Sequence, residues 1–205
     1  SDVCSSDLTA NLTGWLQGMR EGSIVVLAII MGLMLAFDMG GPVNKVAYAF
    51  MLICVSQGVY SVVAIAAVGI AVPPLGMGLA TLIGRKYFTA EERETGKAAL
   101  VMGCVGVTEG AIPFAAADPL RVIPANMIGA ASGCVTAALM GAQCYAGWGG
   151  LIVLPVVQGK LGFVAALLVG ACVSAACVIL LKAFAKKKPT NVATDDELDL
   201  DFEIN

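Results

Sequence analysis

The stretch Thr108–Pro124 reads TEGAIPFAAADPLRVIP and places three charged residues and three prolines between long apolar runs. Proline lacks a backbone N–H and interrupts a continuous helix, and the residue before each proline is pushed toward extended geometry. If the apolar runs lie in a bilayer, charged side chains here must pair or face a polar cavity. The stretch therefore predicts a non-helical, re-entrant hairpin that presents carboxylates and free backbone groups to a polar space.

The overall composition is that of an integral membrane protein. Of the 205 residues, 59% are hydrophobic and only 13% are charged, whereas soluble domains have about 45–50% apolar and about 25% charged residues. One soluble core cannot hold this excess, because a chain of this length must still cover a wetted surface. The prediction is an all-α integral membrane protein, a multi-span helical bundle with broken helices.

The residue counts also argue against several kinds of site. The chain has no histidine, so a histidine metal site or a phosphohistidine on this chain is excluded. Its seven cysteines are scattered and contain no CxxC pair, which favours small buried hydrophobes over disulfides or metal ligands. No basic surface for nucleic acid is visible. We expect no metal, no cofactor and no nucleic-acid partner.

Apolar runs of different length divide the chain. A helix needs about 20 apolar residues to cross the hydrocarbon core, and short runs broken by Gly and Pro point to a transport site. About four full spans and two or three half-length pieces are expected. The apolar runs are 23–37, which ends early, 46–72, which is broken at Pro73–Pro74, a short piece at 75–84, half a span at 98–107, and spans at 125–142 and 161–181. Residues 144–160 are too broken for a span.

Lysine and arginine predict the orientation. The charged segment 84–97 carries four basic residues, and four lysines (Lys182, Lys186, Lys187 and Lys188) follow the last apolar run. The positive-inside rule places both on the cytoplasmic side, so the C-terminus is predicted to be cytoplasmic. The 84–97 segment is either a docking surface for a soluble partner or a merely solvated connector.

Two clusters of polar residues are candidates for a binding site. The first is AFDMGGPVNK, with Asp38, Asn44 and Lys45, and the second is the opening stretch, with Glu109, Asp118 and Arg121. Asp118 and Arg121 can simply neutralise each other across one helical turn, and Asp38 can be an ordinary loop residue after a helix. Glu109 has no near neighbour of opposite charge, so its carboxylate suits substrate hydroxyl groups and could accept a proton.

Several long motifs resemble the membrane-embedded IIC domain of bacterial phosphotransferase-system permeases of the fructose family, in particular its fructose-like members in enteric bacteria. These motifs are LTGWLQGM, LAFDMGGPVNKVAYAF, VPPLGMGLATLIG, FTAEERETGKAALVMG, TEGAIPFAAADPLRVIP and CYAGWGGLIVLPVV. The resemblance runs from about Thr9 to the acidic tail. It implies a family domain with further spans upstream, so residues 9–188 would correspond to its C-terminal part.

The resemblance implies a function and assigns roles. A IIC domain binds a sugar from outside and holds it while a separate IIB protein, supplied by IIA, phosphorylates it, and IIC itself carries no phosphoryl group. Glu109 resembles the carboxylate that contacts the sugar hydroxyls and is the catalytic candidate, and Asp38, Asn44 and Lys45 resemble a second element of the sugar site. Trp148 stands where many members have a histidine, and an aromatic face there can stack on a sugar ring.

Other readings remain open beside this one. Broken helices with acidic residues also suit a secondary sugar transporter driven by protons or sodium, with Glu109 or Asp38 as the coupling carboxylate. A non-transporting sensor is a third reading, without positive support. The resemblance further implies a homodimer in the bacterial inner membrane. Residues 1–8 are expected to be non-native or disordered, and residues 189–205 an acidic disordered cytoplasmic tail.

Overall fold

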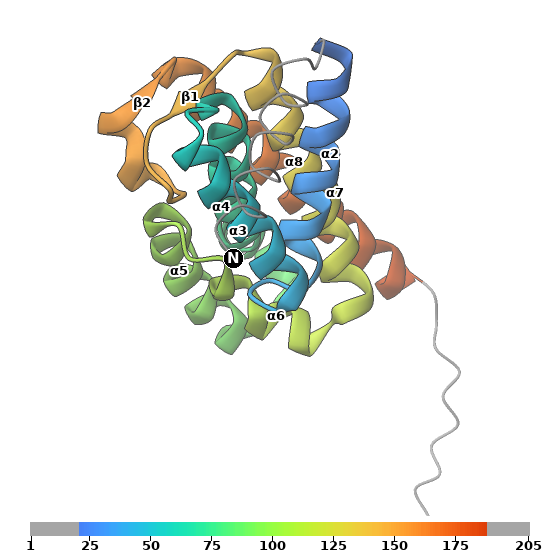
Figure 1. Cartoon of the computed structure of the whole chain (residues 1–205). Helices are drawn as coiled ribbons and strands as arrows, with labels where there is room; N and C mark the ends of the chain where they lie inside the picture. The colour runs from blue at the N-terminus through green and yellow to red at the C-terminus, as the bar shows by residue number, and fades with distance from the viewer. Residues whose placement is uncertain (1–20, 188–205) are drawn as a thin grey trace, which may run out of the picture.

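The computed structural model describes residues 21–187, and these form a bundle of helices around a central helix (Figure 1). The helices are α2 (Glu21–Phe37), α3 (Pro42–Ser56), α4 (Tyr60–Ile83), α5 (Ala90–Val105), α6 (Ile112–Ala117), α7 (Pro119–Leu139) and α8 (Lys160–Lys187). The connections contain the 3-10 turns η1 (Arg85–Tyr87), η2 (Thr108–Ala111) and η3 (Leu151–Val156), and the antiparallel strands β1 (Gln143–Cys144) and β2 (Val157–Gln158). The expectations for residues 1–8 and 189–205 lie outside the described residues.

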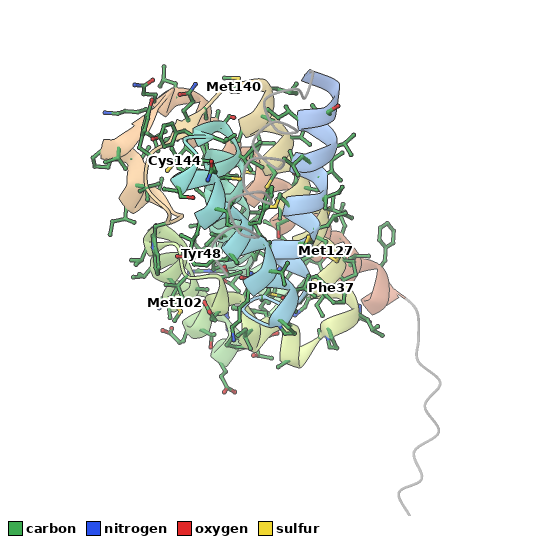
Figure 2. The ribbon with its side chains drawn as sticks, viewed as in Figure 1. Phe37, Tyr48, Met102, Met127, Met140 and Cys144 are labelled. Atoms are coloured by element: carbon green, nitrogen blue, oxygen red, sulfur yellow. The ribbon has the colours of Figure 1, made fainter. Side chains whose placement is uncertain are left out.

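Helix α4 is the centre of the bundle. It is apolar on all sides, as a helix that is buried all round must be, and it is buried almost continuously from Val62 to Gly78. Helices α2, α5, α7 and α8 pack around it. Apolar side chains also cover much of the outside of the bundle, and Phe37 and Met140, labelled in Figure 2, are about half exposed. An exposed apolar surface of this kind suits a surrounding bilayer.

The predicted membrane protein is confirmed, but the number of full spans was overestimated. Within residues 21–187, only α4, α7 and α8 are long and apolar enough to cross a membrane, while α2 and α3 are shorter apolar helices. The expected run 46–72 is two helices, because the chain turns at Gln57–Gly58, where Gly58 adopts a left-handed φ of 73°. The expected break at Pro73–Pro74 is also wrong, since α4 continues through both prolines to Ile83.

The charged segment 84–97 is mostly helical. It contains η1 and the first half of α5. Thr89 and Glu92 form a capping box in which the Thr89 hydroxyl accepts a bond from the Glu92 N–H at 3.1 Å, and the Glu92 carboxylate accepts one from the Thr89 N–H at 2.8 Å. This reciprocal bonding is a strong helix start, and it places α5 across the predicted boundary at residue 98.

The opening stretch is broken, as predicted, but it is mostly helical. The chain leaves helical geometry at Gly106–Val107 and at Asp118, and between them lie η2 and α6. Pro113 and Pro119 stand in the first turns of α6 and α7, where a missing N–H costs nothing because the first turn has no internal acceptor. The expectation of a non-helical stretch is therefore wrong. Of the three prolines in this stretch, only Pro124 lies in the interior of a helix.

Candidate functional site

A pocket of about 480 Å³ opens beside α3 and α4, where the turn at Gly40, the segment 106–109 and the loop at Trp148 come together. Four of the seven predicted site residues lie on its wall, and they come from three separate parts of the chain. Its lining residues are Gly40, Asn44, Lys45, Tyr48, Ile70, Gly106, Val107, Thr108, Glu109, Trp148 and Gly149. A concave, largely apolar pocket with a few converging polar groups is the usual form of a small-molecule site.

Glu109 presents an available carboxylate to this pocket. Its side chain is exposed and takes part in no hydrogen bond or ion pair with any residue between 21 and 187. Gly40 lies directly against it, and a Cβ built at Gly40 would stand 3.0 Å from the Glu109 Oε1 atom. The φ of Gly40 is 113°, a conformation open to glycine. The DMGG turn therefore leaves the carboxylate room because it has no side chain at that point.

Thr108 fixes the position of Glu109 through a proline in α4. The carbonyl of Ile70 would normally accept a bond from the N–H four residues later, but that residue is Pro74, which has no N–H. The Thr108 hydroxyl, which is buried, donates to this Ile70 carbonyl at 3.1 Å. The second proline of the VPPLG motif thus creates a vacant acceptor inside α4, and Thr108 fills it.

Glycine-to-glycine contact joins the Glu109 segment to the loop that carries Trp148. Gly106 and Gly150 both have positive φ, 86° and 84°. A Cβ on Gly106 would lie 2.2 Å from the Gly149 carbonyl oxygen, and one on Gly150 would lie 2.5 Å from the Gly106 nitrogen. Any side chain at these positions would push the two segments apart, so the AGWGG motif is a docking element for the end of α5.

Two aromatic rings form one wall of the pocket. The Trp148 indole N–H donates to the Val105 carbonyl at 2.6 Å, and the Tyr48 hydroxyl, on the side chain labelled in Figure 2, donates to the Gly147 carbonyl at 3.1 Å. The rings meet edge to face, with centroids 6.5 Å apart and planes at 89°, an arrangement that aromatic pairs prefer. Trp148 is 44% exposed, so its ring remains accessible.

The start of α3 contributes Asn44 and Lys45. The Asn44 side-chain amide donates to the Leu35 carbonyl at 2.7 Å, which ties α3 to the end of α2. Lys45 is exposed and forms no ion pair within the described chain. The pocket therefore offers one carboxylate, one ammonium group and one amide, all three carried by short polar interruptions of apolar sequence.

Three predicted residues lie outside the pocket lining. Asp38 caps α3, because its carboxylate oxygens accept bonds from the N–H groups of Val43 at 2.8 Å and Asn44 at 2.9 Å. Arg121 pairs with Asp118 at 2.6 Å across one turn at the start of α7. In both cases the structure favours the local reading, a helix cap and a neutralised pair, over direct contact with a ligand in this pocket.

The sequence reasoning also missed residues that line or support the site. Tyr48, Thr108 and Gly40 line the pocket and were not predicted. Behind them, the Ser174 hydroxyl donates to the Asn126 Oδ1 at 2.6 Å, and the Asn126 amide contacts the Met39 sulfur at 3.7 Å. Asn126 and Ser174 are fully buried. The signal in the sequence was that Asn126 and Ser174 each stand within an apolar run. Polar groups buried in such helices are usually hydrogen-bonded to each other or to the backbone.

Apolar spanning helices, with a partly open pocket where polar residues interrupt the apolar sequence, are typical of a helical membrane protein with a small-molecule site. Comparison with known proteins specifies it further. The chain is 78% identical over 199 residues to "Fructose-like permease IIC component 2" of Escherichia coli (strain K12), which covers 97% of this chain and 55% of that protein. This identity confirms the resemblance inferred from the motifs: over 199 residues, the chain is similar to a fructose-like permease IIC component.

More distant relatives agree with this assignment. Identity is 46% over 176 residues to the "PTS system fructose-specific EIIB'BC component" of Escherichia coli (strain K12), covering 83% of this chain and 31% of that protein. It is 37% over 188 residues to the "PTS system fructose-specific EIIC component" of Haloferax volcanii, covering 91% and 50%. The chain thus spans about half the length of its relatives, or less. No family model and no solved structure matches.

Proposed function

We propose that this chain forms the sugar-binding part of a membrane-embedded IIC component, which translocates a fructose-like sugar in a phosphoenolpyruvate-dependent phosphotransferase system. The observation that carries the proposal is the convergence of Glu109, Asn44, Lys45 and Trp148 on one pocket. These groups suit an uncharged polyhydroxyl ligand, because a carboxylate accepts and an ammonium group donates hydrogen bonds to hydroxyl groups. The exposed Trp148 ring offers an apolar face for the sugar ring.

Glu109 has the central chemical role in this proposal. Its carboxylate accepts hydrogen bonds from sugar hydroxyl groups, and such charge-assisted bonds are each worth about 1.5–3 kcal/mol. It also accepts the proton of the hydroxyl group whose oxygen attacks the phosphoryl group of a partner protein. The phosphoryl group moves from the partner to the sugar oxygen, and this chain forms no covalent bond to it. Asn44, Lys45 and the aromatic wall orient the ring.

The phosphoryl donor in this proposal is a IIB protein supplied by IIA. Relatives whose names combine the B and C components support a close partnership of these parts. We further propose that the partner approaches the face formed by residues 84–97, that the functional unit is a homodimer in a bacterial inner membrane, and that Asp38, Asp118 and Arg121 support the sugar site from outside its lining.

The proposed topology places the 84–97 segment and the C-terminus together on the cytoplasmic side. An ion pair of 3.0 Å joins Lys182 near the end of α8 to Glu92 at the start of α5, and the Lys182 ammonium lies 4.1 Å from the centre of the Phe88 ring. Figure 1 has the β1–β2 pair at the opposite end of the bundle from α6. In this topology α5 enters the bilayer, and η2 with α6 returns as a re-entrant hairpin.

The test is sugar phosphorylation in membrane vesicles that contain this chain with soluble phosphotransferase partners and phosphoenolpyruvate. Glu109→Gln should lower the rate by about 100-fold or more, because it removes the proton acceptor as well as a charge-assisted hydrogen bond. Lys160→Gln is the control, because Lys160 is exposed at the start of α8 and lies outside both the pocket and the 84–97 face. Near-normal phosphorylation by the Glu109 variant would contradict the assignment. Accumulation of free sugar under an ion gradient alone would favour an ion-coupled transporter instead.

A further inference from the structure

A second, basic pocket lies at the end of α4 and is separate from the sugar site. It has a volume of about 280 Å³ and is lined by Thr81, Leu82, Arg85, Ala90, Arg93, Glu94 and Lys97. Three cations and one carboxylate face it, so two positive charges are in excess. Arg85 comes from η1, whereas Arg93 and Lys97 come from one face of α5, one turn apart. Cations from two elements therefore converge on one hollow.

Internal contacts leave much of this positive charge available. Lys97 pairs with Glu94 at 2.8 Å, and this bond from Lys97 lowers the pKa of the Glu94 carboxyl. Arg93 uses only its Nε–H, which donates to the Thr89 carbonyl at 3.3 Å. The Arg85 side chain makes no hydrogen bond or ion pair within residues 21–187. The guanidinium forks match the oxygens of a phosphate group, to which arginine binds with two parallel bonds.

The surroundings of the pocket indicate what carries that phosphate. Leu82 and Ile83, at the end of spanning helix α4, are 43% and 71% exposed. On α5, Val101 follows Lys97 by one turn on the same side and is 65% exposed. Exposed cations thus give way to exposed apolar side chains along one edge of the α4–α5 pair. A ligand that fits both parts has a phosphate head and an apolar body.

We propose that this basic pocket binds the phosphate headgroup of an anionic phospholipid, with its acyl chains along Leu82, Ile83 and Val101. The lipid would lie between the end of α4 and the start of α5, and would hold these elements at the membrane surface. This site is independent of the sugar pocket and requires no phosphotransferase activity. Basic residues at a membrane surface each strengthen binding to anionic lipid by about fivefold.

The experiment is lipid titration of the purified full chain in neutral detergent, read by native mass spectrometry. The probes are phosphatidylglycerol, phosphatidylcholine with the same acyl chains, and inorganic phosphate. Phosphatidylglycerol should bind saturably and more tightly than the other two. Arg85→Gln combined with Arg93→Gln should weaken it about 25-fold, the product of two single losses, and Lys97→Gln alone should weaken it by less.

The control variant removes two positive charges elsewhere, at Lys86 and Lys160, neither of which lines the pocket. It should bind phosphatidylglycerol as the unmodified chain does, and all variants should share one unfolding temperature in phosphatidylcholine. Equal binding of the two lipids, or an equal loss in the control variant, would overturn the proposal. Inorganic phosphate that binds as tightly as phosphatidylglycerol would show a free-anion site and would also overturn it.

Discussion

The bond between Thr108 and the Ile70 carbonyl gives the sharpest test of how the Glu109 segment is held. The perturbation is Thr108→Val, which keeps the shape of the side chain and removes the hydroxyl group. Thr108 is 4% exposed and Ile70 is 5% exposed, so water has little access to the carbonyl that loses its donor. The Ile70 carbonyl then has neither the hydroxyl nor a helical N–H, because the residue four positions later is Pro74.

The expected loss follows from an unpaired buried acceptor. Such a group costs about 1–3 kcal/mol in soluble proteins, while hydrogen bonds between membrane helices have contributed about 0.6–1.7 kcal/mol. We therefore expect Thr108→Val to lower the free energy of unfolding by about 1–2 kcal/mol. At about 2–4 °C per kcal/mol for a chain of this size, the unfolding midpoint should fall by several degrees.

The decisive comparison repeats the substitution in a Pro74→Ala background. Alanine restores the N–H that can bond the Ile70 carbonyl within α4, so the loss of the Thr108 hydroxyl should then cost less than about 0.5 kcal/mol. The difference between the two costs is the coupling energy of a double-mutant cycle. Any cavity left by the smaller alanine side chain is present in both members of that background and cancels.

The assay is thermal unfolding in detergent for the four proteins of the cycle, with sugar binding as a second readout. If Thr108→Val costs the same in both backgrounds, the hydroxyl does not fill a vacancy made by Pro74, and the reasoning is refuted. If it costs nothing in either, the bond itself contributes no stability.

Three further predictions concern the docking glycines, the buried polar pair and the topology. Gly106→Ala should lower the free energy of unfolding by well over the roughly 1–2 kcal/mol of a left-handed alanine, because its Cβ would meet the Gly149 carbonyl. Gly141→Ala, with φ of 62° and no atom within 4 Å of its Cβ, should lose only that backbone contribution. Equal unfolding midpoints of the two variants would contradict the close approach. Ser174→Ala should destabilise the chain by about 1 kcal/mol and weaken sugar binding through Met39 and Gly40. Ser132→Ala loses only a bond of 2.8 Å to its own helix and should leave binding unchanged. Equal effects of the two variants on binding would argue against a link between Ser174 and the site. In a background without the native cysteines, an impermeant thiol reagent outside intact cells should modify a cysteine at Gln143 but not one at Glu91, and the reverse pattern would invert the proposed orientation.

Local features of the sequence predicted much of the architecture. The apolar runs identified the chain as a membrane protein and predicted the spanning helices α7 and α8. Hydropathy and length can be read from contiguous residues. The motifs also identified the family, and Glu109 stood out because no opposite charge lies near it in sequence. Boundaries were less well predicted, since Gly58 ends a helix inside an apolar run and Pro74 does not end one.

The assembly of the site was decided by tertiary structure. Tyr48 and Gly147 are in contact although 99 residues separate them, and no spacing rule relates the DMGG, TEGA and AGWGG segments. Asp38 and Glu109 were both candidate ligands by sequence, yet the Asp38 carboxylate accepts hydrogen bonds from the N–H groups at the start of α3, whereas that of Glu109 faces the pocket. The sequence by itself determines which residues are polar within an apolar chain. Which of them are satisfied locally and which remain available to a ligand depends on the donors that packing brings within reach, and those come from distant segments.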